Sequence, residues 1–240
     1  MKGIKTALIL AGGIGERLRP LTSEIPKPLL EVNGKTILGH QFDLLKKFGI
    51  GKAIISVGYL KEKIMERIGD GNGFGIKVEY VEENSPLGTA GPLNIARESL
   101  SGEENFLCFN ADNLMNLDVK EMLSEHLENR AIATIALVKV HDPRAYGIAR
   151  LEGKRIAEFV EKPARENAPS DCASSGFYIL NRKALGFVEK REGRQMLEYD
   201  VFPKIAEAEG LYGFAHKGQW FDTGTIESYE KVKREWRGNK

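Results

Sequence analysis

A glycine-rich segment near the start of the chain carries residue types suited to binding phosphate. Gly12, Gly13 and Gly15 follow an apolar run, and Arg17 comes shortly after them. Glycines allow backbone N–H groups to approach an anion, and a guanidinium group matches the geometry and charge of phosphate oxygens. A segment of this kind can equally be an ordinary tight turn, so the continuation of the chain has to decide.

Two familiar nucleotide-binding motifs do not fit this segment. A dinucleotide fingerprint anchored at Gly13 and Gly15 requires a third glycine where Leu18 stands. A Walker A loop requires a Gly-Lys-Ser or Gly-Lys-Thr triplet, which this segment lacks. An oxidoreductase would also need an acidic residue closing a second strand, and we set that function aside.

A lysine held between two prolines adds a second cation. Lys27 lies between Pro26 and Pro28, and proline restricts the backbone on both sides of it. A lysine that is merely solvated needs no stiff support. We therefore interpret Lys27 as a point charge presented to an anion.

The compound pattern resembles the signature of the sugar-1-phosphate nucleotidyltransferases, also called NDP-sugar pyrophosphorylases. The matching residues are Gly12-Gly13-x-Gly15-x-Arg17-Leu18-x-Pro20, followed by Pro26-Lys27-Pro28. The resemblance implies that Arg17 and the loop amides, from Leu10 and Ala11 onward, hold the triphosphate of an NTP. It also implies that Lys27 holds the α-phosphate or the departing pyrophosphate.

Two further stretches resemble the parts of this family that read the nucleobase. The loop Pro86-Leu87-Gly88-Thr89-Ala90-Gly91 resembles the one whose backbone contacts the base, and Glu83 aligns with a base-reading position. The resemblance therefore assigns Glu83, Pro86, Gly88 and Thr89 to the nucleotide. Independently, Thr89 or Ser85 is expected to cap a helix that begins here.

Two aspartates are the candidate metal ligands. Asp112 follows an apolar strand in Asn110-Ala111-Asp112-Asn113, and Asp222 lies in Trp220-Phe221-Asp222-Thr223-Gly224-Thr225. The resemblance implies that both hold the catalytic Mg²⁺, and carboxylates suit that hard cation. On sequence alone, Asp112 can also form an Asx turn, and Asp222 can cap the helix near Thr225.

The sugar site is implied by a Glu-Lys pair in Phe159-Val160-Glu161-Lys162-Pro163. By resemblance, Glu161 accepts hydrogen bonds from sugar hydroxyls and Lys162 holds the sugar phosphate, although such a pair before proline can also be a surface turn. The same comparison assigns Asn113, Gly147 and Ser174 to the sugar. Ser174 departs from the family, where Asn or Thr is frequent, and this leaves the sugar undefined.

The elements that must position these residues alternate between strands and helices. The predicted strands are residues 7–10, 53–57, 77–81 and 106–109, and the predicted helices are residues 36–48, 60–68 and 89–100. This pattern predicts an α/β fold with a doubly wound, mostly parallel Rossmann-like sheet. Further strands are predicted at 132–140, 147–151, 155–160 and 175–180, with helices at 196–209 and 226–236. We expect one domain, 1–240, with a nucleotide-binding half to about residue 117 and a mixed-sheet sugar-binding half from about 118.

Composition excludes some partners. Lys and Arg number 35 against 34 Asp and Glu, so the formal net charge of +1 favours neither nucleic acid nor a membrane surface. No signal peptide or membrane-spanning run is evident, and we expect a cytoplasmic protein with reduced Cys108 and Cys172. The chain ends soon after Asp222, so no C-terminal hexapeptide-repeat domain is expected. Homo-oligomerisation is left open.

The expected reaction is in-line attack of a sugar 1-phosphate on the α-phosphorus of an NTP, assisted by Mg²⁺, with release of pyrophosphate. GTP and mannose 1-phosphate are the first choice, because a carboxylate at Glu83 can accept from both N–H donors on guanine. His141 and His216 are not needed, because the attacking phosphate is already ionised. The alternatives are a cytidylyltransferase for a non-sugar phosphate such as phosphocholine and a non-catalytic nucleotide-sensing subunit.

Overall fold

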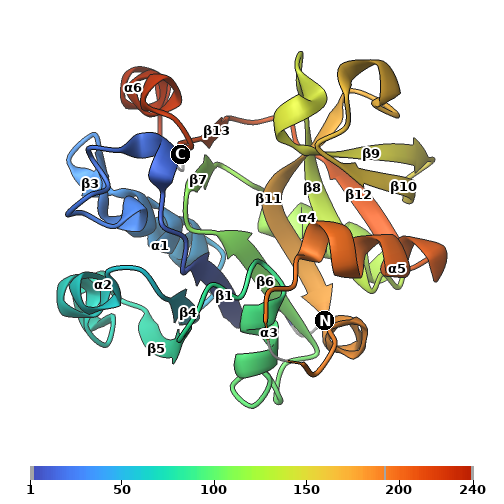
Figure 1. Cartoon of the computed structure of the whole chain (residues 1–240). Coiled ribbons are helices and arrows are strands. Elements are labelled where there is room, and N and C mark those ends of the chain that lie inside the picture. The colour runs from blue at the N-terminus through green and yellow to red at the C-terminus, as the bar shows by residue number, and fades with distance from the viewer. Residues whose placement is uncertain (1–2, 192, 239–240) are drawn as a thin grey trace. The chain divides into compact units, whose positions relative to one another are not determined.

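A computed structural model describes residues 3–191 and 193–238 of the chain (Figure 1). The chain forms two compact units, each built from separate stretches of sequence. Among the described residues, 5–86, 109–117 and 218–238 form the glycine-loop unit, and 3–4, 87–108, 118–191 and 193–217 form the second unit. No helix in the described part of the chain is long and apolar enough to cross a lipid bilayer.

Parallel strands joined by helices form the base of the glycine-loop unit. β1 (Thr6–Ala11) pairs with β4 (Lys52–Val57), and β4 pairs with β5 (Lys77–Glu82), in both cases in parallel. The intervening helices are α1 (Ile37–Lys47) and α2 (Lys61–Ile68). Most interior residues of β1 and β4 are apolar and buried, which is expected when helices cover a parallel sheet, whereas Glu79 and Tyr80 inside β5 are only partly buried.

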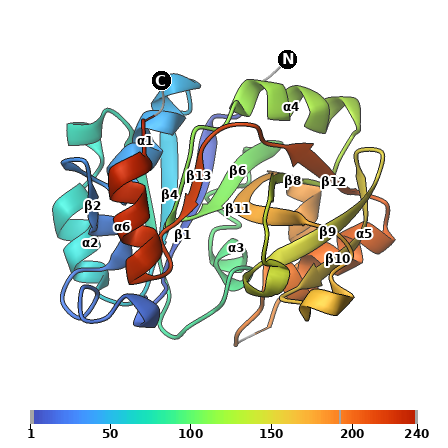
Figure 2. The ribbon, with the colours of Figure 1, turned by 90° about the horizontal axis from the view of Figure 1, so that it is seen from above.

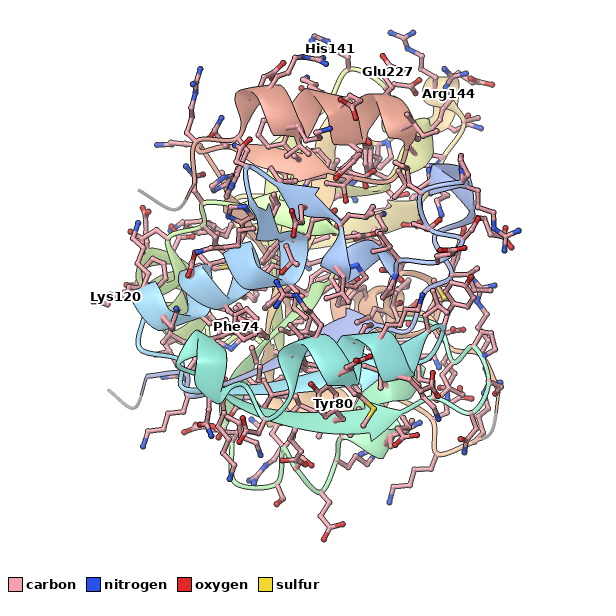
Figure 3. The ribbon with its side chains drawn as sticks, turned by 90° about the vertical axis from the view of Figure 1, so that its left-hand side faces the viewer. Phe74, Tyr80, Lys120, His141, Arg144 and Glu227 are labelled. Carbon is pink, nitrogen blue, oxygen red and sulfur yellow. The ribbon has the colours of Figure 1, made fainter. Side chains whose placement is uncertain are left out.

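Side-chain contacts join α2 to the sheet and α1 to the 3₁₀ turn Asn72–Phe74. The Tyr80 hydroxyl on β5 donates to the Gly69 carbonyl at the end of α2, at 2.7 Å. Phe74 packs edge-on against Phe42 of α1, with ring centroids 5.3 Å apart. Figure 3 shows Phe74 and Tyr80 on the side of the molecule where α1 and α2 lie.

A two-stranded ribbon and a terminal helix complete the same unit. β7 (Asn113–Met115) pairs antiparallel with β13 (Trp220–Asp222), which places Asp222 opposite Asn113. α6 (Ile226–Glu235) begins at Thr225, whose side chain forms a capping box with Ser228. A short hairpin, β2 (Glu31–Val32) and β3 (Lys35–Thr36), precedes α1. The Tyr229 hydroxyl of α6 donates to the Glu31 carbonyl at 2.6 Å, and Figure 2 shows α6 beside β2.

The second unit is a mixed sheet with helices. β8 (Ala133–Lys139) pairs antiparallel with β11 (Cys172–Asn181) and parallel with β12 (Leu211–Ala215). β10 (Arg155–Glu161) pairs antiparallel with β12 and with β9 (Gly147–Glu152). The helices of this unit are α3 (Gly91–Ile95), α4 (Val119–Glu128) and α5 (Phe202–Glu207), the last preceded by a π-helical turn, Leu197–Val201. β6 (Asn105–Asn110) crosses the boundary between the units.

These elements confirm the predicted α/β fold, with parallel strands early in the chain and a mixed sheet later. The helix predicted at 89–100 is much shorter, because α3 covers only Gly91–Ile95. Its N-cap residue is Ala90, without a side-chain cap, so the predicted cap by Thr89 or Ser85 is wrong. The elements that were not predicted are α4, β12 and the short strands β2, β3, β7 and β13. The division into halves at about residue 117 stays a prediction.

Candidate active site

The centre of the glycine-loop unit is an ion pair between residues far apart in sequence. Lys27 Nζ lies 2.7 Å from Asp112 Oδ2, and the Lys27 side chain is only 9% exposed. Lys27 begins a single 3₁₀ turn after Pro26, and Pro28 is also buried. The turn holds the lysine backbone, so little freedom is left for the ammonium group. The stiff presentation expected from the prolines is therefore present.

The glycine loop runs beside this lysine. Gly15 has a left-handed backbone (φ 70°), which favours glycine, and its carbonyl accepts from Thr22 Oγ1 at 2.8 Å. A methyl group on Gly15 would lie 3.6 Å from Lys27 Cβ, so loop and lysine are in contact range. At the end of β1, the Leu10 carbonyl accepts from the Ala111 amide at 3.0 Å. The loop, Lys27 and the segment carrying Asp112 thus meet.

Glu83 lies directly against the same loop. A methyl group on Gly12 would come within 2.2 Å of Glu83 Oε1, so only glycine leaves room for this carboxylate. Ser56 Oγ donates to Glu83 Oε1 at 2.7 Å, and the Glu83 amide donates to Val57 O at 2.8 Å. The proposed base-reading residue is therefore next to the proposed phosphate loop. Pro86 lies at the end of this stretch and is exposed.

Asp222 and Arg17 flank a second close-packed glycine. A methyl group on Gly224 would lie 2.8 Å from Asp222 Oδ1 and 2.9 Å from Arg17 Nη2. Burial and then the Asp112 carboxylate raise the pKa of Asp222, while Lys27 and Arg17 oppose that rise. Two carboxylates and two cations therefore share one electrostatic environment, although they come from four separate places in the sequence.

The predicted sugar residues of the second unit surround a buried carboxylate. Glu161 ends β10 opposite Gly147, and a methyl group on Gly147 would lie 2.7 Å from Glu161 Oε2. The Glu161 side chain is 8% exposed, whereas the Lys162 side chain is 56% exposed. Lys162 Nζ lies 3.2 Å from Glu161 Oε1. Burial raises the pKa of Glu161 against the opposing effect of Lys162. A buried Glu161 does not fit the alternative of an ordinary surface turn.

Sequence model and structure comparisons identify the family. The sequence model described as nucleotidyl transferase matches residues 6–238. The chain belongs to the nucleotidyl transferase family. It is 38% identical to mannose-1-phosphate guanylyltransferase 1 of Arabidopsis thaliana over 229 residues, which cover 93% of this chain and 62% of that protein. It is 39% identical to mannose-1-phosphate guanylyltransferase catalytic subunit beta of Danio rerio over 222 residues, which cover 91% and 61% of the two chains. The chain thus spans about three fifths of the length of these relatives.

Solved structures have the same fold. HddC from Yersinia pseudotuberculosis, complexed with GMP-PN, is 28% identical with a TM-score of 0.80, covering 98% of this chain and 100% of that chain. A putative glucose-1-phosphate thymidylyltransferase from Bacillus anthracis is 24% identical with a TM-score of 0.85, covering 95% and 94% of the two chains. The second match shows the fold alone.

The predicted site residues of this family member lie in both units. The glycine-loop unit contains Leu10, Ala11, Gly12, Gly13, Gly15, Arg17, Lys27, Glu83, Pro86, Asp112, Asn113 and Asp222. The second unit contains Gly88, Thr89, Gly147, Glu161, Lys162 and Ser174. Asn113, which we predicted to bind sugar, is buried in β7 in the unit of the metal-ligand candidates.

The Asp112 and Asp222 carboxylates suit a hard cation. Burial, and after it the Asp112 carboxylate, raises the pKa of Asp222, so the two negative charges disfavour each other unless cations balance them. Lys27 contacts only one oxygen of Asp112. The described residues contain no group of three or more His, Cys, Asp or Glu that could enclose a metal. Mg²⁺ usually takes one or two carboxylates and completes its coordination with water and phosphate oxygens, so these residues fit it.

A buried network beside the sugar candidates escaped the sequence analysis. Glu198, 8% exposed, accepts from Thr89 Oγ1 at 2.5 Å and from the Tyr178 hydroxyl at 3.4 Å. Ser174 Oγ donates to that hydroxyl at 3.5 Å. Burial raises the pKa of Glu198, and Glu161 raises it further. A glutamate inside the apolar run 196–202 was the available signal. The Thr89 side chain, which we assigned to the nucleotide, is engaged with Glu198 and with the Leu197 amide at 2.8 Å.

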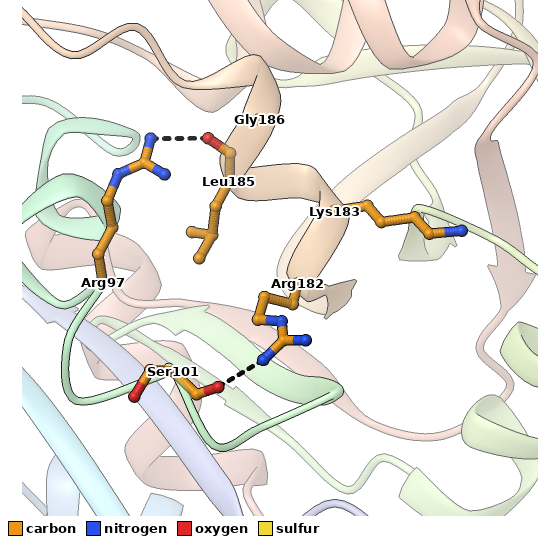
Figure 4. Close-up of a pocket in the computed structure, with 6 residues that line it drawn as sticks. All are labelled: Arg97, Ser101, Arg182, Lys183, Leu185 and Gly186. Carbon is orange, nitrogen blue, oxygen red and sulfur yellow. Dashed lines mark hydrogen bonds between the residues drawn. The ribbon is translucent and has the colours of Figure 1, made fainter.

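A cavity elsewhere in the second unit lacks the predicted site residues. It has a volume of about 520 Å³ and is lined by Arg97, Ser101, Arg182, Lys183, Leu185 and Gly186 (Figure 4). The Arg97 guanidinium donates to the Leu185 carbonyl at 2.7 Å, and Arg182 donates to the Ser101 carbonyl at 2.5 Å. Both guanidinium groups therefore already bind backbone oxygens, and the cavity carries no functional assignment.

Proposed function

We propose that this protein joins an NTP to a sugar 1-phosphate and releases pyrophosphate, forming an NDP-sugar. The observation that carries the proposal is the Lys27–Asp112 pair at 2.7 Å beside the glycine loop, with Asp222 and Arg17 at Gly224. This is the charge arrangement that transfer at a phosphate requires, because polyanions must be neutralised and positioned. The relatives named mannose-1-phosphate guanylyltransferase support the same reaction.

In the proposed mechanism, the glycine-loop amides and Arg17 bind the triphosphate, and Lys27 stabilises the negative charge that leaves with pyrophosphate. Lys162 binds the phosphate of the sugar and orients its oxygen for in-line attack. We propose Asp112 and Asp222 as the ligands of Mg²⁺, which when bound would neutralise charge on the phosphate oxygens. The attacking oxygen is already ionised, so no general base and no covalent intermediate are required.

We propose GTP as the nucleotide. The Glu83 carboxylate lies against Gly12 and can accept the two adjacent N–H donors of the guanine Watson–Crick edge. Uracil and thymine offer one such donor. The names of the curated relatives and the GMP-PN complex of HddC support guanine as well.

We propose mannose 1-phosphate as the sugar substrate. The buried Glu161 carboxylate would accept hydrogen bonds from sugar hydroxyls. A methyl group on Gly147 would lie 2.7 Å from Glu161 Oε2, so glycine at this position lets the carboxylate lie against the backbone of β9. A sugar that lacks the matching hydroxyl would leave this buried carboxylate without its hydrogen bond, so the site should discriminate strongly against such sugars. We further propose a cytoplasmic location, where both substrates are available.

A substrate matrix tests this proposal. Purified protein with Mg²⁺ is assayed for pyrophosphate release with each of five NTPs and a panel of sugar 1-phosphates, together with phosphocholine. We expect release only when an NTP and a sugar 1-phosphate are both present, fastest for GTP with mannose 1-phosphate. NTP hydrolysis without a sugar, or activity only with phosphocholine, would refute the proposed reaction. A preference for UTP or dTTP would refute the guanine assignment alone.

A further inference from the structure

A buried glutamine of α1 binds the turn that carries Asp112. Gln41 is 2% exposed, and its single amide nitrogen donates to two backbone carbonyls. The distances from Nε2 are 3.0 Å to Asn110 O and 2.8 Å to Asn113 O. Both hydrogens of the amide are therefore used on the residues that bracket Ala111 and Asp112.

The peptide between those carbonyls is held from other elements as well. The Ala111 amide donates to Leu10 O at the end of β1, at 3.0 Å. The Asp112 carbonyl accepts from the Thr223 amide at 3.1 Å and from Thr223 Oγ1 at 2.7 Å. α1, β1 and the segment after β13 thus fix consecutive peptide groups of one turn, and the Asp112 carboxylate is left to pair with Lys27.

The orientation of the Gln41 amide is fixed at a cost. Because Nε2 faces two carbonyls, exchanging the nitrogen and oxygen would place oxygen against oxygen. In the actual orientation Oε1 is buried and has no hydrogen-bond partner among the described residues. An unmet buried acceptor destabilises a fold. Replacing Gln41 with methionine takes the donor away from the Asn110 and Asn113 carbonyls, which is destabilising, and removes the unmet buried acceptor, which offsets part of that cost.

We propose that Gln41 is a positioning residue, whose amide fixes the Asn110–Asn113 turn so that the Asp112 carboxylate remains in its working place beside Lys27. This inference rests on the proposed function for its catalytic consequence. Gln41 does not touch the reacting atoms. Small displacements of a positioned group cost large factors in rate, because the geometry of approach is lost.

The test compares Gln41→Met with Thr36→Ala, a control on the same helix. Thr36 caps α1 by accepting from the Gly39 amide at 3.0 Å, and it does not bind the turn. Hydrogen exchange of the amides of Ala111, Asp112 and Asn113 is measured in both variants without substrates. Steady-state kinetics are measured with the NTP and sugar 1-phosphate that support pyrophosphate release.

We expect Gln41→Met to accelerate exchange at these amides by about 10-fold or more, while Thr36→Ala leaves them near the wild-type rate. Its kcat should fall by about 100-fold, with KM for the NTP within about threefold of wild type. Unchanged exchange in Gln41→Met, or a kcat equal to that of Thr36→Ala, would overturn the inference. A wild-type protein without activity would refute the proposed function alone, and the exchange rates would still decide whether Gln41 fixes the turn.

Discussion

The polar groups of the two units are stabilised in different ways. In the glycine-loop unit, opposite charges meet directly, as in the Lys27–Asp112 pair. In the second unit, Glu198 is buried among uncharged donors, Thr89 and Tyr178. Backbone constraints from proline and glycine, together with the Gln41 and Thr223 contacts to the turn carrying Asp112, place the first set. A chain of side-chain hydrogen bonds places the second. We therefore expect charge neutralisation at the nucleotide in the first unit, and in the second unit recognition of sugar hydroxyls beside Lys162, which we propose to hold the sugar phosphate.

The largest effect is expected from Asp222→Asn in the glycine-loop unit. The amide keeps the shape of the side chain but removes one of the two negative charges proposed to face Mg²⁺. We expect kcat to fall by about 10³-fold, with smaller changes in KM because the cations remain. Thr225 already caps α6, so the melting temperature should hardly change. Near-normal turnover with an unaltered Mg²⁺ dependence would remove Asp222 from the metal site.

A smaller effect is expected where Glu83 meets the glycine loop. In Gly12→Ala the added methyl group would meet the Glu83 carboxylate at 2.2 Å and force it away. KM for the NTP should rise by about 10- to 100-fold, as expected when a hydrogen-bonded base reader is displaced. Gly51→Ala is the control, because its methyl group meets nothing within 4 Å. Equal KM values for the NTP in the two variants would show that Glu83 does not take part in nucleotide binding.

The second unit should respond through the sugar substrate. Glu161→Gln replaces an ionised acceptor by a neutral amide, and KM for the sugar 1-phosphate should rise by about 10-fold while KM for the NTP stays constant. Glu158→Gln on the same strand is the matched control, because the Glu158 side chain is exposed. If both substitutions affect the sugar equally, Glu161 has no special role in binding it.

The smallest effect concerns stability rather than activity. His126 of α4 is buried between Thr134 Oγ1 (2.8 Å) and Asn105 Oδ1 (3.1 Å), and burial lowers its pKa from 6.5 to about 4. The unfolded chain therefore binds this proton first as the pH falls. The free energy of unfolding should lose up to about 3 kcal/mol between pH 6.5 and pH 4 on account of this residue, and be independent of it above pH 6.5.

Denaturant unfolding across that pH range measures this loss. His126→Gln cannot titrate and should show a flatter pH dependence than the wild type. Identical slopes in the two proteins would show that His126 is not the group responsible. The active-site carboxylates are unchanged in both, so their contribution cancels in the comparison.

Local sequence signals predicted β1, β4 and β5 of the glycine-loop unit, because these strands contain apolar runs, and its loop, which is set by glycine and proline. They missed the short strands β2, β3, β7 and β13 of the same unit. The alternative that Asp222 caps α6 is wrong, because the N-cap residue of that helix is Thr225. Contacts between residues far apart in the chain could not be predicted from the sequence. The pairing of Asp222 with Asn113 joins β13 to β7, and Gln41 looks like an ordinary polar helix residue until the turn above it is known. Thr89 has the residue type of a helix cap, but the π-helical turn that begins at Leu197 engages it instead.

The proposed reaction depends most on the sugar 1-phosphate oxygen bonding to the α-phosphorus of the NTP. The direct measurement is a single-turnover reaction with the α-³²P form of the NTP that gives the fastest pyrophosphate release, followed by separation of the products and the protein. The account predicts that the label appears in an NDP-sugar only when the sugar 1-phosphate is present, and that pyrophosphate and protein stay unlabelled. Label recovered as free nucleoside monophosphate, or bound covalently to the protein, would contradict it.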